Sequence, residues 1–107
     1  MIRKHPTRPF LRAWRKRLGK TAEWLANEIG TVHSTVLRYE AGTTGVDDAT
    51  FEAIAKAYGI SIAELSAHPN DAEKARAMDR ILRAIRDMDE EGLSVIAGFA
   101  ERMKPRN

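Results

Sequence analysis

Apolar and polar residues alternate along this chain with the period of short amphipathic helices. Within residues 21–29, one apolar stripe is formed at i, i+3, i+4 and i+7 by Ala22, Leu25, Ala26 and Ile29. This spacing predicts a helix with a single buried side, which Gly30 ends. A second stripe begins at once and predicts a helix over residues 32–41, ended by Gly42; its members are Val32, Val36 and Tyr39.

The short connection between these helices predicts a helix-turn-helix. Only Gly30 and Thr31 separate the two stripes, so the chain has no slack to lay the helices antiparallel, and they must cross at a steep angle. In a helix-turn-helix the second helix places its outer face in the major groove of DNA. Residues 32–41 are therefore the predicted recognition helix.

The same stretch resembles the helix-turn-helix domain of the lambda repressor and Cro family, also called the XRE family. The matching residues are Thr21, Leu25, Ala26, Gly30, Ser34, Thr35, Val36, Arg38, Glu40 and Gly42. The run STVLRYEAG is similar to that family's recognition helix with its Glu-x-Gly ending. The resemblance covers about residues 10 to 68 and implies an all-α, five-helix, lambda-repressor-like DNA-binding head at residues 10–69.

Three further patterns supply the other helices of this head. A first helix is expected to start near Pro9, with its buried side formed by Leu11, Trp14 and Leu18. A fourth helix is expected after a cap at Asp47 or Asp48, with apolar residues Phe51, Ile54, Ala55 and Tyr58. Ser61 and Glu64 form a capping-box pattern for a short fifth helix. Since Val32 has no side-chain acceptor, we expect Thr31 to cap the recognition helix one residue early.

Residues 70–107 predict a C-terminal helical hairpin that follows a linker at residues 68–71. Its first helix carries the stripe Met78, Ile81, Leu82, Ile85 and Met88. Asp89 is expected to cap its second helix, whose apolar residues include Leu93, Ile96, Phe99 and Met103. Such a hairpin exposes too much apolar surface to stand alone. We expect these residues to form a homodimer; packing on the chain's own head is the alternative.

Charge is distributed unevenly over the chain. Residues 1–45 carry nine bases and three acids, a net +6, whereas residues 46–107 carry nine bases and twelve acids, a net −3. A polyanion such as DNA would be attracted to the half with the helix-turn-helix. Residues 1–9, with two prolines and several bases, are expected to be a flexible basic arm.

Other classes of site find no support in the composition. The chain has no cysteine, its three histidines are far apart, and it has neither a nucleophile–base pattern nor a phosphate loop. We therefore expect no metal, no cofactor and no enzymatic activity. It also has no apolar run of membrane-spanning length and no signal-peptide core, so we expect a cytoplasmic protein without a membrane partner.

The outer face of residues 32–41 supplies the candidate base contacts. Helical geometry places four residues on that face, namely His33, Ser34, Leu37 and Arg38. Thr35 lies at its flank. Ser34 can bond a base edge or phosphate, Arg38 can pair with guanine, and Leu37 can cover a thymine methyl. Further candidate DNA contacts are Thr21, Ala22 through its backbone N–H, Thr43, Arg12, Lys16, Arg17 and Lys20.

The resemblance also implies a structural ion pair. In the family, the glutamate at the position of Glu40 pairs with an arginine of the first helix, and Arg15 stands at that position here. We therefore expect an ion pair between Arg15 and Glu40 that joins the first helix to the recognition helix.

The sequence thus predicts a sequence-specific regulator of transcription that binds double-stranded DNA as a homodimer. Repression is the expected outcome, because proteins that resemble this one repress more often than they activate. One alternative is an antitoxin, which would hold a toxin partner with its C-terminal hairpin and repress its own promoter. Another is a protein-interaction module that has lost DNA binding, which the residues Ala22, Val32 and Thr43 would favour.

Overall fold

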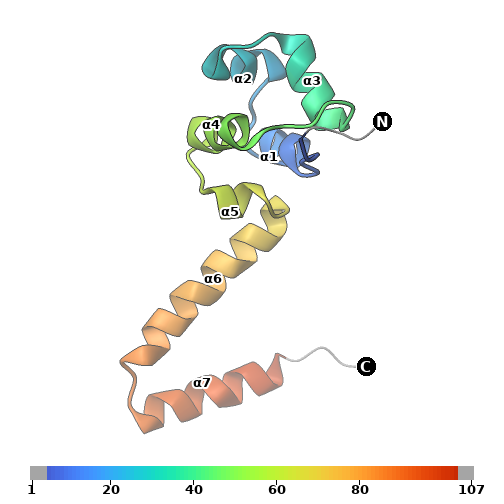
Figure 1. The fold of residues 1–107 in the computed structure, drawn as a ribbon. Helices are drawn as coiled ribbons and strands as arrows, with labels where there is room; N and C mark the ends of the chain where they lie inside the picture. Colours follow the sequence, from blue (N-terminus) through green and yellow to red (C-terminus); the bar gives the residue numbers. More distant parts are fainter. Residues whose placement is uncertain (1–4, 104–107) are drawn as a thin grey trace. The chain divides into compact units, whose positions relative to one another are not determined.

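The computed structural model describes residues 5–103, and their secondary structure is entirely helical. The helices are α1 (Leu11–Arg17), α2 (Ala22–Ile29), α3 (His33–Ala41), α4 (Asp48–Tyr58), α5 (Ile62–Leu65), α6 (Pro69–Arg86) and α7 (Glu90–Arg102). The predicted all-α class is confirmed. The chain divides into two compact units between Glu73 and Lys74, so the first turn of α6 belongs to the first unit (Figure 1).

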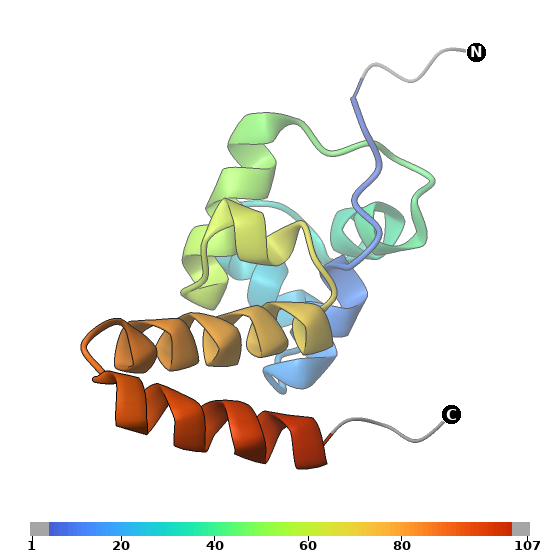
Figure 2. The same ribbon diagram turned by 90° about the horizontal axis from the view of Figure 1, so that it is seen from below.

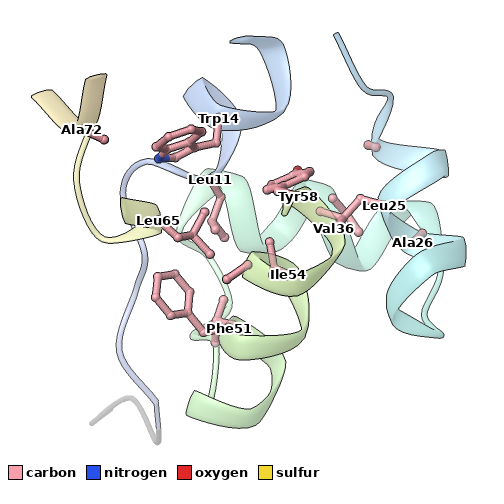
Figure 3. Packing of buried hydrophobic residues seen from close by; sticks show 13 residues of the cluster. Leu11, Trp14, Leu25, Ala26, Val36, Phe51, Ile54, Tyr58, Leu65 and Ala72 are labelled. Atoms are coloured by element: carbon pink, nitrogen blue, oxygen red, sulfur yellow. The ribbon is translucent and has the colours of Figure 1, made fainter. Parts of the chain in front are cut away.

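One hydrophobic core holds the first unit together. Its largest fully buried side chains come from the five helices α1 to α5 and from the loop before α4, namely Leu11, Leu25, Val36, Val46, Ile54 and Leu65 (Figure 3). Trp14 and Phe51 extend this cluster, with exposed fractions of 5% and 2%. The helices α1 to α5 are too short to be stable alone, so their stability depends on this shared burial.

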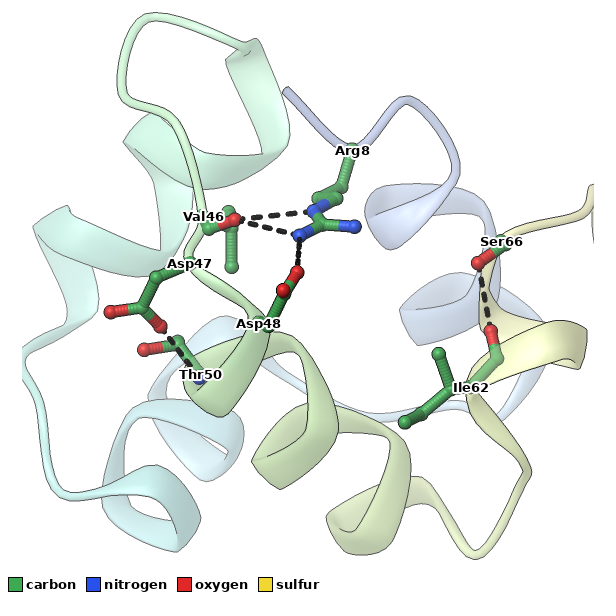
Figure 4. Close-up of polar contacts among 7 residues, drawn as sticks. All are labelled: Arg8, Val46, Asp47, Asp48, Thr50, Ile62 and Ser66. Atoms are coloured by element: carbon green, nitrogen blue, oxygen red, sulfur yellow. Dashed lines mark hydrogen bonds and ion pairs between the residues drawn. The ribbon is translucent and has the colours of Figure 1, made fainter. Parts of the chain in front are cut away.

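Side-chain caps start most of the helices where the sequence predicts them. Thr21 accepts a hydrogen bond from the Trp24 N–H, and Asp47 accepts one from the Thr50 N–H (Figure 4). Ser61 and Glu64 form both bonds of a capping box, and Asp89 caps α7. Each cap satisfies a backbone donor that the first helical turn leaves unpaired.

The expected cap at Thr31 is wrong. The N-cap of α3 is Val32, which has no side-chain hydrogen bond, and α3 begins at His33. Thr31 instead completes the end of α2, because its N–H donates to the Ala26 carbonyl at 2.8 Å after Gly30 turns with φ 74°. The first turn of α3 therefore starts without a side-chain cap.

The linker expected at residues 68–71 is also wrong. Pro69 is the first residue of α6 and is buried, and Ala72 belongs to the core with 6% exposure. Proline fits the first turn of a helix because that position needs no N–H donor. The start of α6 is therefore part of the head, and the Trp14 Nε1–H adds a hydrogen bond to the Ala67 carbonyl just before it, at 2.8 Å.

The segment before α1 is attached to the loop between α3 and α4. The Pro6 carbonyl accepts a hydrogen bond from the Val46 N–H at 2.8 Å. The Arg8 guanidinium donates to the Val46 carbonyl at 3.0 and 3.2 Å and pairs with Asp48 at 2.9 Å (Figure 4). Arg8 also lies 4.2 Å from the centre of the Phe51 ring. Of the arm expected at residues 1–9, residues 1–4 lie outside the described part of the chain.

The second unit contains the rest of α6 and α7, which are joined by a short turn and diverge from it (Figure 1 and Figure 2). Its large apolar side chains remain exposed, including Met78 at 51%, Leu82 at 55% and Phe99 at 60%. Within residues 5–103, none of the helices is both long enough and apolar enough to cross a membrane.

Candidate nucleic-acid interface

The turn between α2 and α3 fixes the two helices against each other. Gly30 ends α2 in the left-handed conformation, which costs glycine little because it has no Cβ. On the core side, Leu25 and Ala26 of α2 and Val36 of α3 are each at most 2% exposed. Burial of Val36 determines which side of α3 faces inward.

The opposite side of α3 is open to solvent. His33, Ser34 and Arg38 are exposed, and Leu37 is 42% exposed. The residue before them, Val32, is 61% exposed. The structure therefore leaves all four predicted base-contacting residues on one accessible face, while Thr35 at the flank is half-buried.

Arg38 and Thr35 are joined within this face. The Arg38 Nη2 donates to Thr35 Oγ1 at 3.1 Å. This bond uses one of the five N–H donors of the guanidinium and leaves the others available. Thr35 thus positions the side chain that is best suited to a bidentate contact with guanine.

The acidic residue of α3 is neutralised by α1. Glu40 accepts hydrogen bonds from Arg15 Nε at 2.6 Å and Nη2 at 3.0 Å, and the two side chains are only 4% and 14% exposed. The hydrogen bonds that Arg15 donates to Glu40 raise the pKa of Arg15, against the opposing effect of burial. Arg15 also donates to the Lys20 carbonyl at 3.1 Å. The Glu40 carboxylate, which alone would repel phosphates, is therefore neutralised by its ion pair with Arg15.

A shallow hollow brings α1 and α3 together at the surface. It has a volume of about 210 Å³ and is lined by Arg12, Arg15, Leu37, Glu40 and Ala41. Arg12 is exposed at its rim, so a basic side chain of α1 lies beside the outer face of α3. Lys16, one turn further along α1, is also exposed.

At the start of α2, Lys20 is held over an aromatic ring. Its Nζ lies 4.6 Å from the centre of the Trp24 ring, and Trp24 stacks on Tyr58 with a ring separation of 6.2 Å. A cation over an aromatic face is stabilised by the ring quadrupole. We did not expect this contact from the sequence, although the i, i+4 spacing of Lys20 and Trp24 is a usable signal.

Three other candidate residues are restricted by their own contacts. The Thr21 hydroxyl caps α2, and Ala22 is 5% exposed, so only its backbone N–H remains for a phosphate. The Thr43 hydroxyl donates to the Arg38 carbonyl at 3.3 Å and so helps to close the end of α3.

Arg17 is directed to the start of α6 instead of to the recognition helix. It pairs with Glu73 at 2.9 Å and hydrogen-bonds Asn70. The expectation that Arg17 supplies a basic DNA contact is therefore not supported by its surroundings. Among the described residues, no group of three or more His, Asp or Glu side chains is placed to hold a metal ion.

Comparison with known proteins agrees with this geometry. Residues 9–67, more than half of the chain, match the family described as "Helix-turn-helix domain". The cryptic phage CTXphi transcriptional repressor RstR of Vibrio cholerae is 36% identical over 76 residues, which are 69% of this chain and 68% of that protein. No solved structure matches the chain. The chain therefore belongs to the helix-turn-helix family of DNA-binding transcriptional regulators of the lambda repressor and Cro type.

Proposed function

We propose that this protein is a cytoplasmic repressor that occupies a two-fold DNA operator as a homodimer, with α3 of each copy in the major groove. The observation that carries the proposal is the open face of α3, where Ser34, Leu37 and Arg38 are exposed while Val36 is buried and Glu40 is neutralised. Repression is proposed because RstR, which is similar over 76 residues, is a transcriptional repressor.

Each residue on this face has a distinct role. Arg38, positioned by Thr35, donates to O6 and N7 of a guanine. Ser34 bonds a base edge or a phosphate near the start of α3, and Leu37 covers a thymine methyl group. His33 lies on the same exposed face and adds a polar contact at its edge.

Phosphate contacts come from the neighbouring helices. Arg12 and Lys16 of α1 are exposed, and Arg12 lies beside Leu37 at the rim of the hollow. Lys20 is held at the start of α2, where the backbone N–H of Ala22 and the helix dipole favour an anion. These contacts set the orientation of α3 and make the affinity dependent on salt.

Two copies double the contacts and match the symmetry of an operator. Half-sites of such dimers lie one helical turn apart, about 34–36 Å. The exposed apolar residues of the second unit are the proposed contact between copies, since Met78, Ile81 and Leu82 are each about half exposed, at 51%, 49% and 55%.

The test measures affinity for DNA from upstream of the protein's own gene and for a scrambled sequence at two salt concentrations. Arg38→Ala is expected to lower the preference for upstream DNA by about 1–3 kcal/mol, and a Ser34→Ala, Arg38→Ala double change to remove it. Arg12→Gln and Lys16→Gln are expected to weaken binding to both DNAs. Each is also expected to reduce the slope of log affinity against log salt concentration by about one. Arg83→Ala, an exposed α6 residue, is the matched control.

The proposal predicts that the melting temperature is unchanged in the α3 variants. If the wild type binds both DNAs equally, or if Arg38→Ala leaves the preference intact, α3 is not the reading element.

A further inference from the structure

The apolar surface of α7 has two sides, and one of them is unusually open. Val95, Phe99 and Met103 are 68%, 60% and 69% exposed, and their i, i+4, i+8 spacing places them in one stripe along the helix. Leu93 and Ile96, on the adjoining side, are less exposed at 39% and 38%. Sequence reasoning missed Val95, because it lies outside the i, i+3, i+7 pattern of Leu93, Ile96 and Ala100.

This surface is too wide for one neighbouring helix to cover. At 100° per residue, the arc from Val95 through Phe99 and Ile96 to Ala97 spans about 200°, whereas a helix facing a single neighbour has an apolar stripe of about 100°. The other helix of the same unit, α6, can lie along only one side of α7. The Val95–Phe99–Met103 stripe is left for a second contact.

Charges beside the stripe identify what covers it. Glu91 precedes Val95 by one helical turn and Arg102 follows it by two, so both border the same edge of the stripe. They lie in the first and last turns of α7, and neither forms an ion pair with another residue of the described segment. An edge that is acidic at one end and basic at the other is complementary to itself when a second copy runs antiparallel.

We propose that α7 pairs antiparallel with α7 of a second copy of this chain. In this arrangement Val95 packs against the partner's Phe99, and Glu91 forms an ion pair with the partner's Arg102. Two-fold symmetry repeats each contact, so the interface is isologous. One register accommodates both pairs, because the midpoint of Glu91 and Arg102 lies between Ile96 and Ala97 and the midpoint of Val95 and Phe99 lies at Ala97, about half a residue away along the helix.

The inference deepens the homodimer of the proposed function by naming its contact surface, and it rests on that homodimer. The charge pattern also favours a second copy of this chain over an unrelated protein as the partner of α7. An unrelated protein would need neither a shared midpoint nor opposite charges at the two ends of α7, whereas a second copy needs both. Such end charges contribute more to the specificity of pairing than to its affinity.

The test is a charge exchange followed by sedimentation equilibrium of the full chain. Glu91→Arg and Arg102→Glu each replace two symmetric attractions with two repulsions, so each is expected to raise the dimer Kd at least about tenfold. The double variant restores both pairs and is expected to return the Kd to within about threefold of wild type. Val95→Glu is expected to give a monomer, because it places a charge in the apolar contact with the partner's Phe99.

Glu90→Arg is the matched control. It lies in the same first turn of α7 and disturbs the helix dipole equally, but it borders the opposite edge of the apolar arc. Its Kd is expected to stay near that of wild type, and far-UV circular dichroism checks that all variants keep their helices.

Three results would overturn the inference: a monomeric wild type, single reversals that do not differ from Glu90→Arg, or a double variant that stays dissociated. A monomer that still prefers its upstream DNA and needs Arg38 would leave DNA reading intact and remove only this interface. The converse, a dimer that responds to charge exchange but does not discriminate between DNAs, would refute the proposed function and keep the interface.

Discussion

Arg15 of α1 and Glu40 of α3 form a bidentate ion pair, with Nε–Oε2 at 2.6 Å and Nη2–Oε1 at 3.0 Å. The Glu40 side chain is only 4% exposed, so it depends on Arg15 for its charge compensation. The same guanidinium bonds the Lys20 carbonyl just before α2. This pair thus connects three consecutive elements of the head and lets an acidic residue occupy the recognition helix.

We expect Arg15→Ala to lower the free energy of unfolding by about 3–5 kcal/mol, because it leaves the buried Glu40 carboxylate unpaired. Urea denaturation followed by circular dichroism measures the change. Arg17→Ala is the control, since its partner Glu73 is 73% exposed, and the expected loss there is below about 1 kcal/mol. Equal losses in the two variants would mean that Glu40 is compensated from elsewhere.

Val32→Ser is expected to stabilise the protein by about 1 kcal/mol. Val32 is the N-cap of α3 but provides no side-chain acceptor, and serine at that position would accept a hydrogen bond from the first turn. Little packing is lost, because Val32 is 61% exposed. Thr21→Ala, which removes an existing cap from α2, is expected to change the stability by a similar amount in the opposite direction. A melting temperature that does not rise in Val32→Ser would contradict this account of α3.

Tyr58→Phe is expected to be as stable as wild type at pH 7, or more stable by up to about 1 kcal/mol. The Tyr58 hydroxyl is buried and has no hydrogen-bond partner among the described residues, so removing it leaves no acceptor or donor unsatisfied. The stacking on Trp24 remains available to phenylalanine. A clear loss of stability in this variant would show that the hydroxyl is bonded.

The same variant gives a pH signature. Burial is the main cause that raises the pKa of Tyr58 above its ordinary value of 10.0, and the charge of Glu40 adds to the effect. A raised folded-state pKa contributes stability that is complete below pH 10 and is lost as the pH rises beyond it. We therefore expect wild type to lose more stability than Tyr58→Phe between pH 9 and 11, measured by urea denaturation at each pH. Parallel pH profiles would contradict the burial of this hydroxyl.

The helices and their caps could be predicted from the sequence because the determining interactions are local. The stripe from Ala22 to Ile29 and the acceptors Thr21, Asp47 and Ser61 act within one or two turns of chain. The same locality explains why the open face of α3 could be deduced, since burial of Val36 leaves His33, Leu37 and Arg38 on the other side.

The linker before α6 was misread for the opposite reason. His68 to Asp71 combine proline and polar residues, which is typical of a loop, and nothing within this segment indicates that Ala72 is buried in the core. The partners of Arg17 are likewise 53 and 56 residues away in sequence, at Asn70 and Glu73. Contacts over such distances depend on how the helices pack, and no local pattern specifies them.

The sequence by itself therefore determined the helical class, the helix-turn-helix and the face of α3 that is available to DNA, because each follows from helical periodicity and short-range capping. Only the tertiary structure decided which basic residues remain available: Arg12, Lys16 and Lys20 stay at the surface of the head, whereas Arg8 and Arg17 are used in ion pairs within it. It also decided that Val95 is exposed beside Phe99. The physical reason is that charge pairing and burial depend on distances in space between residues that are far apart along the chain.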